Sequence, residues 1–297
     1  EVGLREGLQS NNICLKLEDK IKLIDQLIDA GLRRIQLGSF VNEKRVPQMA
    51  GVEELFRHYA DNSDVLFSGL VLNKRGLERA LECNVKLINI SISASNEHNI
   101  ENTGKTIEEA LPSVIEMIKT AKAEGAMVRA GIQAAFGCHF KGAPDISIIT
   151  SQTERYMEAG ADEIGLSDTS GFATPGVIKK IIGEVKYFTR ETPIGIHLHD
   201  TFGMGMANVM ASIDAGAATI DSSVAGMGGC PFMPDAPGNL PTEDLLHMLH
   251  SMNIVRYIKL DKVVEAADTA RKLFGKDFTG VISKNYQLFK KLNLLEN

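Results

Sequence analysis

His197 and His199 occupy alternate positions in the run Ile194-Gly-Ile-His-Leu-His-Asp200. Alternate side chains of an extended strand project to the same face, so both imidazoles would point toward one place. Imidazole nitrogens are common ligands of divalent metals. In the alternative interpretation, one histidine packs in the core and the other faces solvent. The spacing therefore raises the hypothesis of a metal site, for which the rest of the chain must supply further ligands.

The elements that would position this pair alternate between strand and helix patterns. Strand patterns cover residues 1–3, 34–38, 65–71, 86–91, 127–134, 163–167, 194–199 and 218–223, and helical patterns cover 16–30, 52–59, 77–82, 107–124, 147–159, 176–188 and 205–215. Eight such strand and helix units within about 250 residues predict a TIM (β/α)8 barrel. An open, doubly wound sheet is the alternative, but no strand pattern is followed by a Gly-x-Gly-x-x-Gly phosphate loop.

Three further helical patterns, at residues 242–252, 260–274 and 281–294, follow the last strand. We therefore predict a catalytic barrel domain over residues 1–255 and a C-terminal helical extension over residues 256–297 that packs on the barrel. Related barrels often form dimers, so a homodimer is the default expectation.

Composition narrows the class of partner. The chain has 297 residues, 44% hydrophobic residues and a formal net charge of −6, which argues against nucleic acid or an anionic membrane as the main partner. Its four cysteines are widely spaced, as is typical of a reducing compartment, either bacterial cytoplasm or an organelle matrix. The sequence begins at Glu1 without an initiator methionine, so we expect further residues upstream.

Polar residues gather where the predicted strands end, which is where a TIM barrel carries its active site. They are Arg5, Glu6 and Gln9; Gln36 and Ser39; Arg129 and Gln133; Asp168 and Thr169; and Asn239 after the last strand. The Glu6 carboxylate, the two imidazoles and the Asn239 amide oxygen would suit a six-coordinate Mg²⁺ or Mn²⁺, with Zn²⁺ or Co²⁺ not excluded. Two open positions would remain for a hydroxy acid or keto acid. Arg5 would stabilise a developing oxyanion.

A glycine- and proline-rich segment, residues 225–239, contains Cys230. Glycine lets a loop close over a ligand, and proline limits the shapes that the loop can take. Cys230 is therefore a candidate catalytic thiol, with a structural or redox role as the alternative.

These motifs resemble the 3-hydroxy-3-methylglutaryl-CoA lyases, within the TIM-barrel metal-dependent lyases and Claisen-type synthases. The matching runs include Glu1-Val-Gly-Leu-Arg-Glu-Gly-Leu-Gln9, Leu166-Ser-Asp-Thr-Ser-Gly171, His197-Leu-His-Asp-Thr-Phe-Gly203, Asp221-Ser-Ser-Val-Ala-Gly-Met-Gly-Gly-Cys-Pro231 and Gly238-Asn-Leu-Pro-Thr-Glu-Asp244. The resemblance implies a small acyl-CoA substrate and a retro-Claisen cleavage that releases acetyl-CoA and a keto acid, acetoacetate for the parent substrate.

The resemblance also implies a role for each matching residue. The metal ligands would be Glu6, His197, His199 and Asn239, and the catalytic groups Arg5, Asp168, His197 and Cys230. Arg5 would polarise the thioester carbonyl, Asp168 and His197 would take part in proton transfer, and Cys230 would be the catalytic thiol. The pocket would include Gln9, Gln36, Ser39, Arg129 and Thr169.

The chain departs from the family pattern beside this site. Glu6 replaces an aspartate, although the similar homocitrate synthases also read Arg-Glu-Gly. Gln36 and Gly38 replace a glutamate and a threonine, which predicts a lost carboxylate and an opened space. Glu43 and Arg45 follow on the same loop. We therefore expect an altered pocket and an acyl group other than 3-hydroxy-3-methylglutaryl. The alternatives are a Claisen-type synthase that joins acetyl-CoA to a 2-oxo acid, and a barrel that has lost catalysis and serves in binding or regulation.

Overall fold

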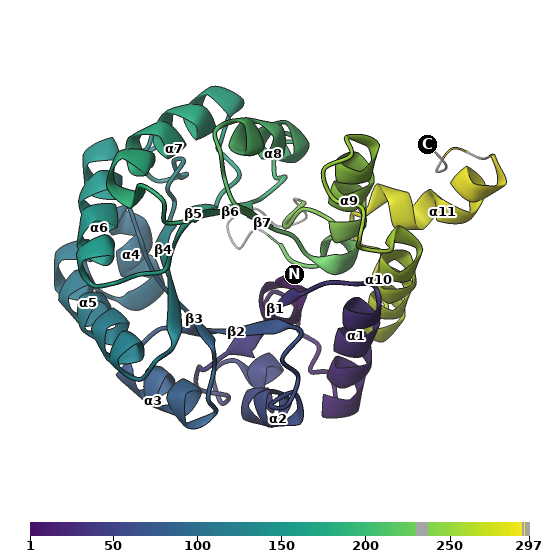
Figure 1. Cartoon of the computed structure of the whole chain (residues 1–297), viewed down its shortest axis with the longest axis horizontal. Coiled ribbons are helices and arrows are strands. Elements are labelled where there is room, and N and C mark those ends of the chain that lie inside the picture. Colours follow the sequence, from purple (N-terminus) through teal and green to yellow (C-terminus); the bar gives the residue numbers. More distant parts are fainter. Residues whose placement is uncertain (230–236, 293, 295–297) are drawn as a thin grey trace.

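Parallel strands joined by helices form one curled sheet in the computed structural model, which describes residues 1–229, 237–292 and 294. Its strands are β1 (Arg34–Ser39), β2 (Leu66–Val71), β3 (Leu87–Ser93), β4 (Met127–Gln133), β5 (Glu163–Asp168), β6 (Ile194–Leu198) and β7 (Thr219–Asp221). They pair in sequence order, from β1 to β7. Figure 1 shows the sheet curving around a central axis with helices on its outer side. The predicted alternation of strands and helices is confirmed.

Helices before and between the strands cover the outer face of the sheet, except α4, which lies beside a cavity after β3. They are α1 (Leu17–Asp29), α2 (Val52–His58), α3 (Lys74–Glu82), α4 (Asn96–Thr103), α5 (Ile107–Ala123), α6 (Ile146–Glu158), α7 (Pro175–Thr189) and α8 (Gly205–Asp214). Strand residues that face this layer are apolar and fully buried, for example Val128, Ile164 and Ile196. The alternate residues face the interior of the curled sheet and are mostly polar. Helix α4 was not predicted, because its residues are mostly polar and lack an apolar stripe.

The strand predicted at residues 1–3 is not a regular strand in the structure. The Val2 amide donates to the Ser222 carbonyl at 2.8 Å, and the Gln36 amide donates to the Glu1 carbonyl at 2.8 Å, so these two residues lie between the end of β7 and β1. The backbone then turns into a short π-helix, η1 (Gly3–Gly7). A Cβ atom at Gly3 would lie 2.6 Å from Glu1 Oε1, 2.8 Å from Met227 Cε and 2.9 Å from Ser223 Oγ, so a larger residue here would require these side chains to shift. The described residues therefore form an open, curled sheet of seven parallel strands, in which the predicted eighth strand is not a regular element.

Three helices follow β7, as predicted: α9 (Thr242–Ser251), α10 (Leu260–Phe274) and α11 (Val281–Lys291). Helix α10 packs beside α1 (Figure 1), and the Lys259 amide donates to the Ala30 carbonyl at 2.7 Å. None of the helices in the described part of the chain is both long and apolar enough to cross a membrane.

Candidate metal centre and pocket

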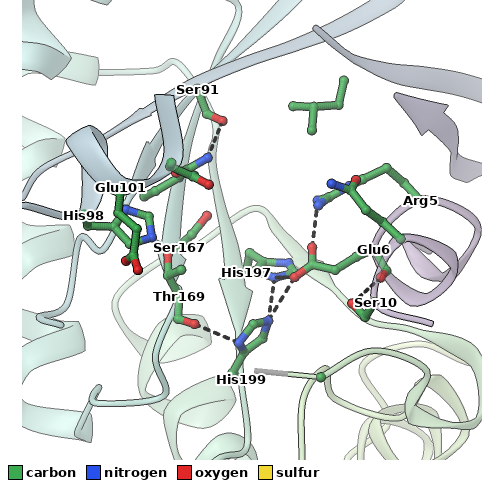
Figure 2. Close-up of a pocket in the computed structure, with 15 residues that line it drawn as sticks. Arg5, Glu6, Ser10, Ser91, His98, Glu101, Ser167, Thr169, His197 and His199 are labelled. Atoms are coloured by element: carbon green, nitrogen blue, oxygen red, sulfur yellow. Dashed lines mark hydrogen bonds and ion pairs between the residues drawn. The ribbon is translucent and has the colours of Figure 1, made fainter. Parts of the chain in front are cut away.

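Glu6, His197 and His199 meet at the carboxyl ends of the strands (Figure 2). His197 lies on β6 and His199 directly after it, while η1 brings Glu6 across from the chain terminus. Glu6 Oε1 lies 3.2 Å from His197 Nε2 and 3.0 Å from His199 Nε2, and the two Nε2 atoms lie 3.2 Å apart. The three side chains that we predicted as ligands from distant segments are thus brought together.

A hydrogen bond to the backbone fixes the tautomer of His199 and so decides which ring nitrogen has a lone pair. His199 Nδ1 lies 3.0 Å from the Thr169 carbonyl oxygen, which can only accept a hydrogen bond. Nδ1 therefore carries the proton, and in the neutral ring Nε2 presents a lone pair to Glu6. His197 Nδ1 similarly faces Asp221 Oδ2 at 3.4 Å. Acceptor atoms converge at one point, an arrangement that a shared cation stabilises.

Charge at the site is set by competing effects. Burial would raise the pKa of Glu6, but Arg5 and His197 beside it hold that pKa well below 4.5. Burial would lower the pKa of His197, but the Glu6 carboxylate and Asp221 raise it. Burial would likewise raise the pKa of Asp221, yet Arg129 and His197 hold it well below its usual range. Glu6 and Asp221 are therefore carboxylates at neutral pH.

Asn239 lies beside His199 in an isolated antiparallel bridge. Its Nδ2 donates to the Met227 carbonyl at 2.9 Å, which fixes the orientation of the amide. Its Oδ1 is buried and accepts no hydrogen bond from the residues that the structure describes. An orphaned oxygen on the residue that bridges to His199 fits a fourth ligand, so the residues present suit a divalent metal with mixed nitrogen and oxygen ligands.

Arg5 is held in place from two sides. Its Nη2 lies 2.8 Å from Glu6 Oε2, and its Nε donates to Gln36 Oε1 at 2.6 Å. Gln36 therefore contacts the site through Arg5 and presents a neutral amide oxygen where a carboxylate would add a negative charge.

A cavity of about 660 Å³ opens above the cluster. Six of the residues predicted from the sequence line it: Arg5, Glu6, Gln9, Thr169, His197 and His199. A smaller hollow of about 50 Å³ is lined by Arg5 and His197 together with Gln36, Arg129 and Asp221. Two predicted pocket residues, Gln36 and Arg129, thus line the smaller hollow and not the larger cavity.

Ser39 and Asp168 line neither space. The Ser39 side chain is buried, and its amide donates to Met49 Sδ at 3.3 Å. Both carboxylate oxygens of Asp168 lie 3.1 Å from the Ala173 amide, which donates to them. Burial raises the pKa of Asp168 to about 6 even though the Ala173 hydrogen bond opposes the shift. In this position Asp168 organises the loop after β5, from which the Thr169 carbonyl accepts the hydrogen bond of His199.

The expected space at Gly38 is not present. A Cβ atom built there would lie 2.9 Å from Val52 Cγ2, so the position faces α2 and not the cavity. A register shift between Gln36 and Gly38 on β1 accounts for this orientation. Glu43 and Arg45 are exposed and do not line either space, and Glu43 lies 3.9 Å from Arg79. Of these four departures, only Gln36 contacts the site.

Cys230, the predicted catalytic thiol, lies outside the described residues. Gly229, the residue before it, lines the cavity.

In the wall opposite the histidines, only Gln133 was anticipated from the sequence, as a polar residue at a strand end. Asn102 on α4 donates to Gln133 Oε1 at 3.2 Å, and Gln133 Nε2 donates to Ser91 Oγ at 2.9 Å. His98 and Glu101 of α4 lie on the same side of the cavity (Figure 2). The available signal was the position of this polar segment directly after a strand end, where TIM barrels carry substrate-binding loops.

Comparison with known proteins is consistent with this geometry. The HMGL-like family model matches residues 1–270. The 3-hydroxy-3-isohexenylglutaryl-CoA/hydroxy-methylglutaryl-CoA lyase of Pseudomonas aeruginosa is 35% identical over 93% of this chain and 92% of its own length. The structure of the Bacillus subtilis HMG-CoA lyase matches with a TM-score of 0.90 at 34% identity, over 98% of this chain and 96% of that one.

A third similar structure is an HMG-CoA lyase of Acinetobacter baumannii in complex with coenzyme A and 3-methylmalate. It matches with a TM-score of 0.89 at 34% identity, over 96% of this chain and 93% of that one. The family match covers most of the chain, and the relatives align over nearly their whole length. The chain therefore belongs to the HMGL-like family.

Proposed function

We propose that this protein is a metal-dependent carbon–carbon lyase that cleaves a 3-hydroxy-3-methylglutaryl-CoA-like thioester into acetyl-CoA and a keto acid, acetoacetate for the parent substrate. The single observation that carries the proposal is the convergence of Glu6, His197 and His199 below a cavity of about 660 Å³, with Arg5 at its edge. Family membership and the relatives that are named as lyases support it.

A divalent cation, Mg²⁺ or Mn²⁺ in our proposal, would be held by Glu6, His197, His199 and Asn239. When bound, such a cation acts as a Lewis acid that stabilises negative charge on substrate oxygens. In this proposal His197 serves as a ligand and does not move a proton, because its Nε2 faces Glu6 and its Nδ1 faces Asp221.

The reaction needs two proton transfers and one charge stabilisation. The substrate 3-hydroxyl gives its proton to water in the cavity, the C2–C3 bond breaks, and its electron pair forms the acetyl-CoA enolate, which is then protonated at C2. Arg5 lines the cavity and is fixed by Glu6 and Gln36, so its guanidinium is placed to stabilise the enolate oxygen. We assign proton delivery to Cys230 on the motif in which it lies. Asp168 is proposed to support the site by holding the loop after β5 rather than by touching the substrate.

The proposal has two further parts, the acyl group of the substrate and the direction of the reaction. We propose that the neutral Gln36 beside Arg5 alters substrate specificity, so that the preferred acyl group differs from 3-hydroxy-3-methylglutaryl. A Claisen-type synthase that condenses acetyl-CoA with a 2-oxo acid is the second candidate, since the same metal site and Arg5 would serve a reaction in that direction.

The test is acetyl-CoA release from 3-hydroxy-3-methylglutaryl-CoA and from homologues with longer 3-alkyl groups, with Mn²⁺ and a thiol reductant. We expect turnover by the wild type and its loss in Cys230→Ser, with Mn²⁺ binding retained in the variant. Activity only in the condensation assay, with acetyl-CoA and 2-oxo acids, would replace the lyase with the synthase.

We also infer several properties of the whole molecule. Glu1 and Val2 take the place of an eighth strand that closes the barrel, as their bonds to β1 and to the end of β7 suggest. Residues 1–255 form the barrel domain and 256–297 its helical extension. The thiols of Cys14, Cys83 and Cys138 are free, which supports a reducing compartment, bacterial cytoplasm or an organelle matrix. A homodimer is the assembly that we expect.

A further inference from the structure

A chain of buried charges runs from the metal centre into the interior of the sheet. Arg129 Nη1 lies 2.7 Å from Asp221 Oδ1, and Arg129 Nε lies 3.2 Å from Glu163 Oε1. Arg34 Nη1 lies 2.7 Å from Glu163 Oε2. At the other end, Asp221 Oδ2 faces His197 Nδ1 at 3.4 Å. Two cations and two carboxylates thus alternate along a path that ends on a proposed metal ligand.

Strand register places these residues side by side. Arg129 on β4 pairs with Glu163 on β5, and His197 on β6 pairs with Asp221 on β7. Arg129 and Asp221 therefore belong to strands that are separated by β5 and β6. The guanidinium must cross both strands to reach the carboxylate, which requires space in the interior of the sheet.

Two glycines provide that space. A Cβ atom at Gly165 on β5 would lie 2.8 Å from Arg129 Nε. A Cβ atom at Gly195 on β6 would lie 2.8 Å from Arg129 Nη2 and 2.3 Å from Glu163 Oε1. Glycine within a strand weakens the sheet and often marks a site where another group approaches closely. The two strands therefore form a cradle that fits the Arg129 guanidinium.

Stability alone is a poor reason for such an arrangement. Arg129 and Glu163 are only 7% and 6% exposed, and desolvating buried ions offsets much of the attraction between them. Apolar residues would fill the same volume at similar or lower cost. The feature that apolar residues could not reproduce is a carboxylate acceptor fixed behind His197.

We propose that Asp221 and Arg129 are positioning residues for the metal centre. Arg129, held by Glu163, fixes the Asp221 carboxylate, whose Oδ2 lies 3.4 Å from His197 Nδ1 and is placed to attract its proton. This keeps the ring proton on Nδ1, so the Nε2 lone pair points at the metal. Partners behind a ligating histidine act in this way in many metal sites, and their loss weakens metal binding by about 10- to 100-fold. The inference rests on the metal site proposed above.

The experiment compares Mn²⁺ binding to the metal-free wild type, Asp221→Asn and Arg129→Lys by titration calorimetry. Asp221→Asn keeps the side-chain shape and removes the carboxylate, while Arg129→Lys keeps the charge and removes the forked donor. Asp162→Asn is the matched control: it alters another ion pair, in which Lys122 contacts both Asp162 oxygens, and Asp162 is bound to the Val128 amide near the opposite ends of the strands. Thermal unfolding of each variant measures any loss of stability.

We expect Mn²⁺ binding weakened by about 10- to 100-fold in Asp221→Asn, with a smaller loss in Arg129→Lys and wild-type affinity in Asp162→Asn. Nitrogen-15 NMR of labelled histidine in the metal-free proteins, at a pH above the pKa of His197, gives an independent readout: the neutral ring should be the Nδ1–H tautomer in the wild type and a mixture in Asp221→Asn. Wild-type affinity and an unchanged tautomer in Asp221→Asn would overturn the inference and leave a structural ion pair. Absence of Mn²⁺ binding by the wild type would instead overturn the proposed metal site.

Discussion

Glu243, at the start of α9, is a fully buried carboxyl group whose ionisation should limit stability. Its Oε2 accepts from the Ala225 amide at 2.9 Å, and its Oε1 accepts from the Ser283 hydroxyl. Arg271 Nη2 is 3.8 Å from Oε1, beyond hydrogen-bonding distance. Burial raises the pKa of Glu243 to about 7, although the Ser283 hydrogen bond opposes the shift. The protonated form is thus favoured in the folded protein.

The size of the effect follows from the two pKa values. The pKa is 4.5 for the unperturbed group and about 7 in the folded protein, and each unit corresponds to about 1.4 kcal/mol. The protonated carboxyl stabilises the fold fully below about pH 4.5, and this contribution is lost as the pH rises through about 7. Glu243→Gln mimics the protonated group at every pH. Between about pH 4 and about pH 8, the wild type should therefore lose about 3 kcal/mol of stability relative to the variant.

The assay is urea unfolding of metal-free wild type and Glu243→Gln at several pH values, followed by circular dichroism. Burial also raises the pKa of the neighbouring Asp244, but that residue is present in both proteins, so its effect largely cancels in the difference. Glu265→Gln is a control with the same change in formal charge on an exposed ion pair, which contributes little. If the curves of wild type and Glu243→Gln stay parallel across this pH range, the buried carboxyl is ionised at little cost and the reasoning fails.

Three further outcomes are expected at the site and beside it. His199→Ala should abolish measurable Mn²⁺ binding in calorimetry, because one of the four proposed ligands is lost; unchanged affinity would exclude His199 as a ligand. Gln36→Glu should raise kcat/KM for 3-hydroxy-3-methylglutaryl-CoA several-fold, because a carboxylate holds Arg5 Nε more strongly than an amide does; a decrease would show that the neutral side chain suits this substrate. Gly38→Ala should lower stability by about 1–3 kcal/mol with little change in KM, since the added Cβ meets Val52; an altered KM would contradict this placement.

The position of the site could be predicted from the sequence because parallel strands share one carboxyl edge. The alternation of His197 and His199 on one strand placed both rings on the same face, and the structure shows their Nε2 atoms 3.2 Å apart. The path of the first segment could not be predicted in the same way. The pattern at residues 1–3 suggested a strand, but the backbone forms the π-helix η1 from Gly3, and Glu6 lies on this helix.

The buried ion pairs of Arg129 with Asp221 and Glu163 could not be predicted from the sequence either. Arg129 looked like a pocket residue because it lies on a strand, but its direction depends on space left by Gly165 and Gly195 on the neighbouring strands. Its pairing with Asp221 depends on the register of four strands. Such register is set by the packing of the whole sheet, so an isolated motif does not contain it.

Met227 explains how ligands from opposite ends of the chain are kept in one place. Its carbonyl accepts from Asn239 Nδ2, which orients the amide oxygen that we propose as a ligand. Its side chain packs so closely on η1 that a Cβ atom at Gly7 would lie 2.6 Å from Met227 Cβ. Glu6 precedes Gly7, so the same residue supports both the Glu6 and the Asn239 sides of the centre. Met227 precedes Cys230 by only three residues, so the residue that supports these two proposed ligands is also close in the chain to the proposed catalytic thiol.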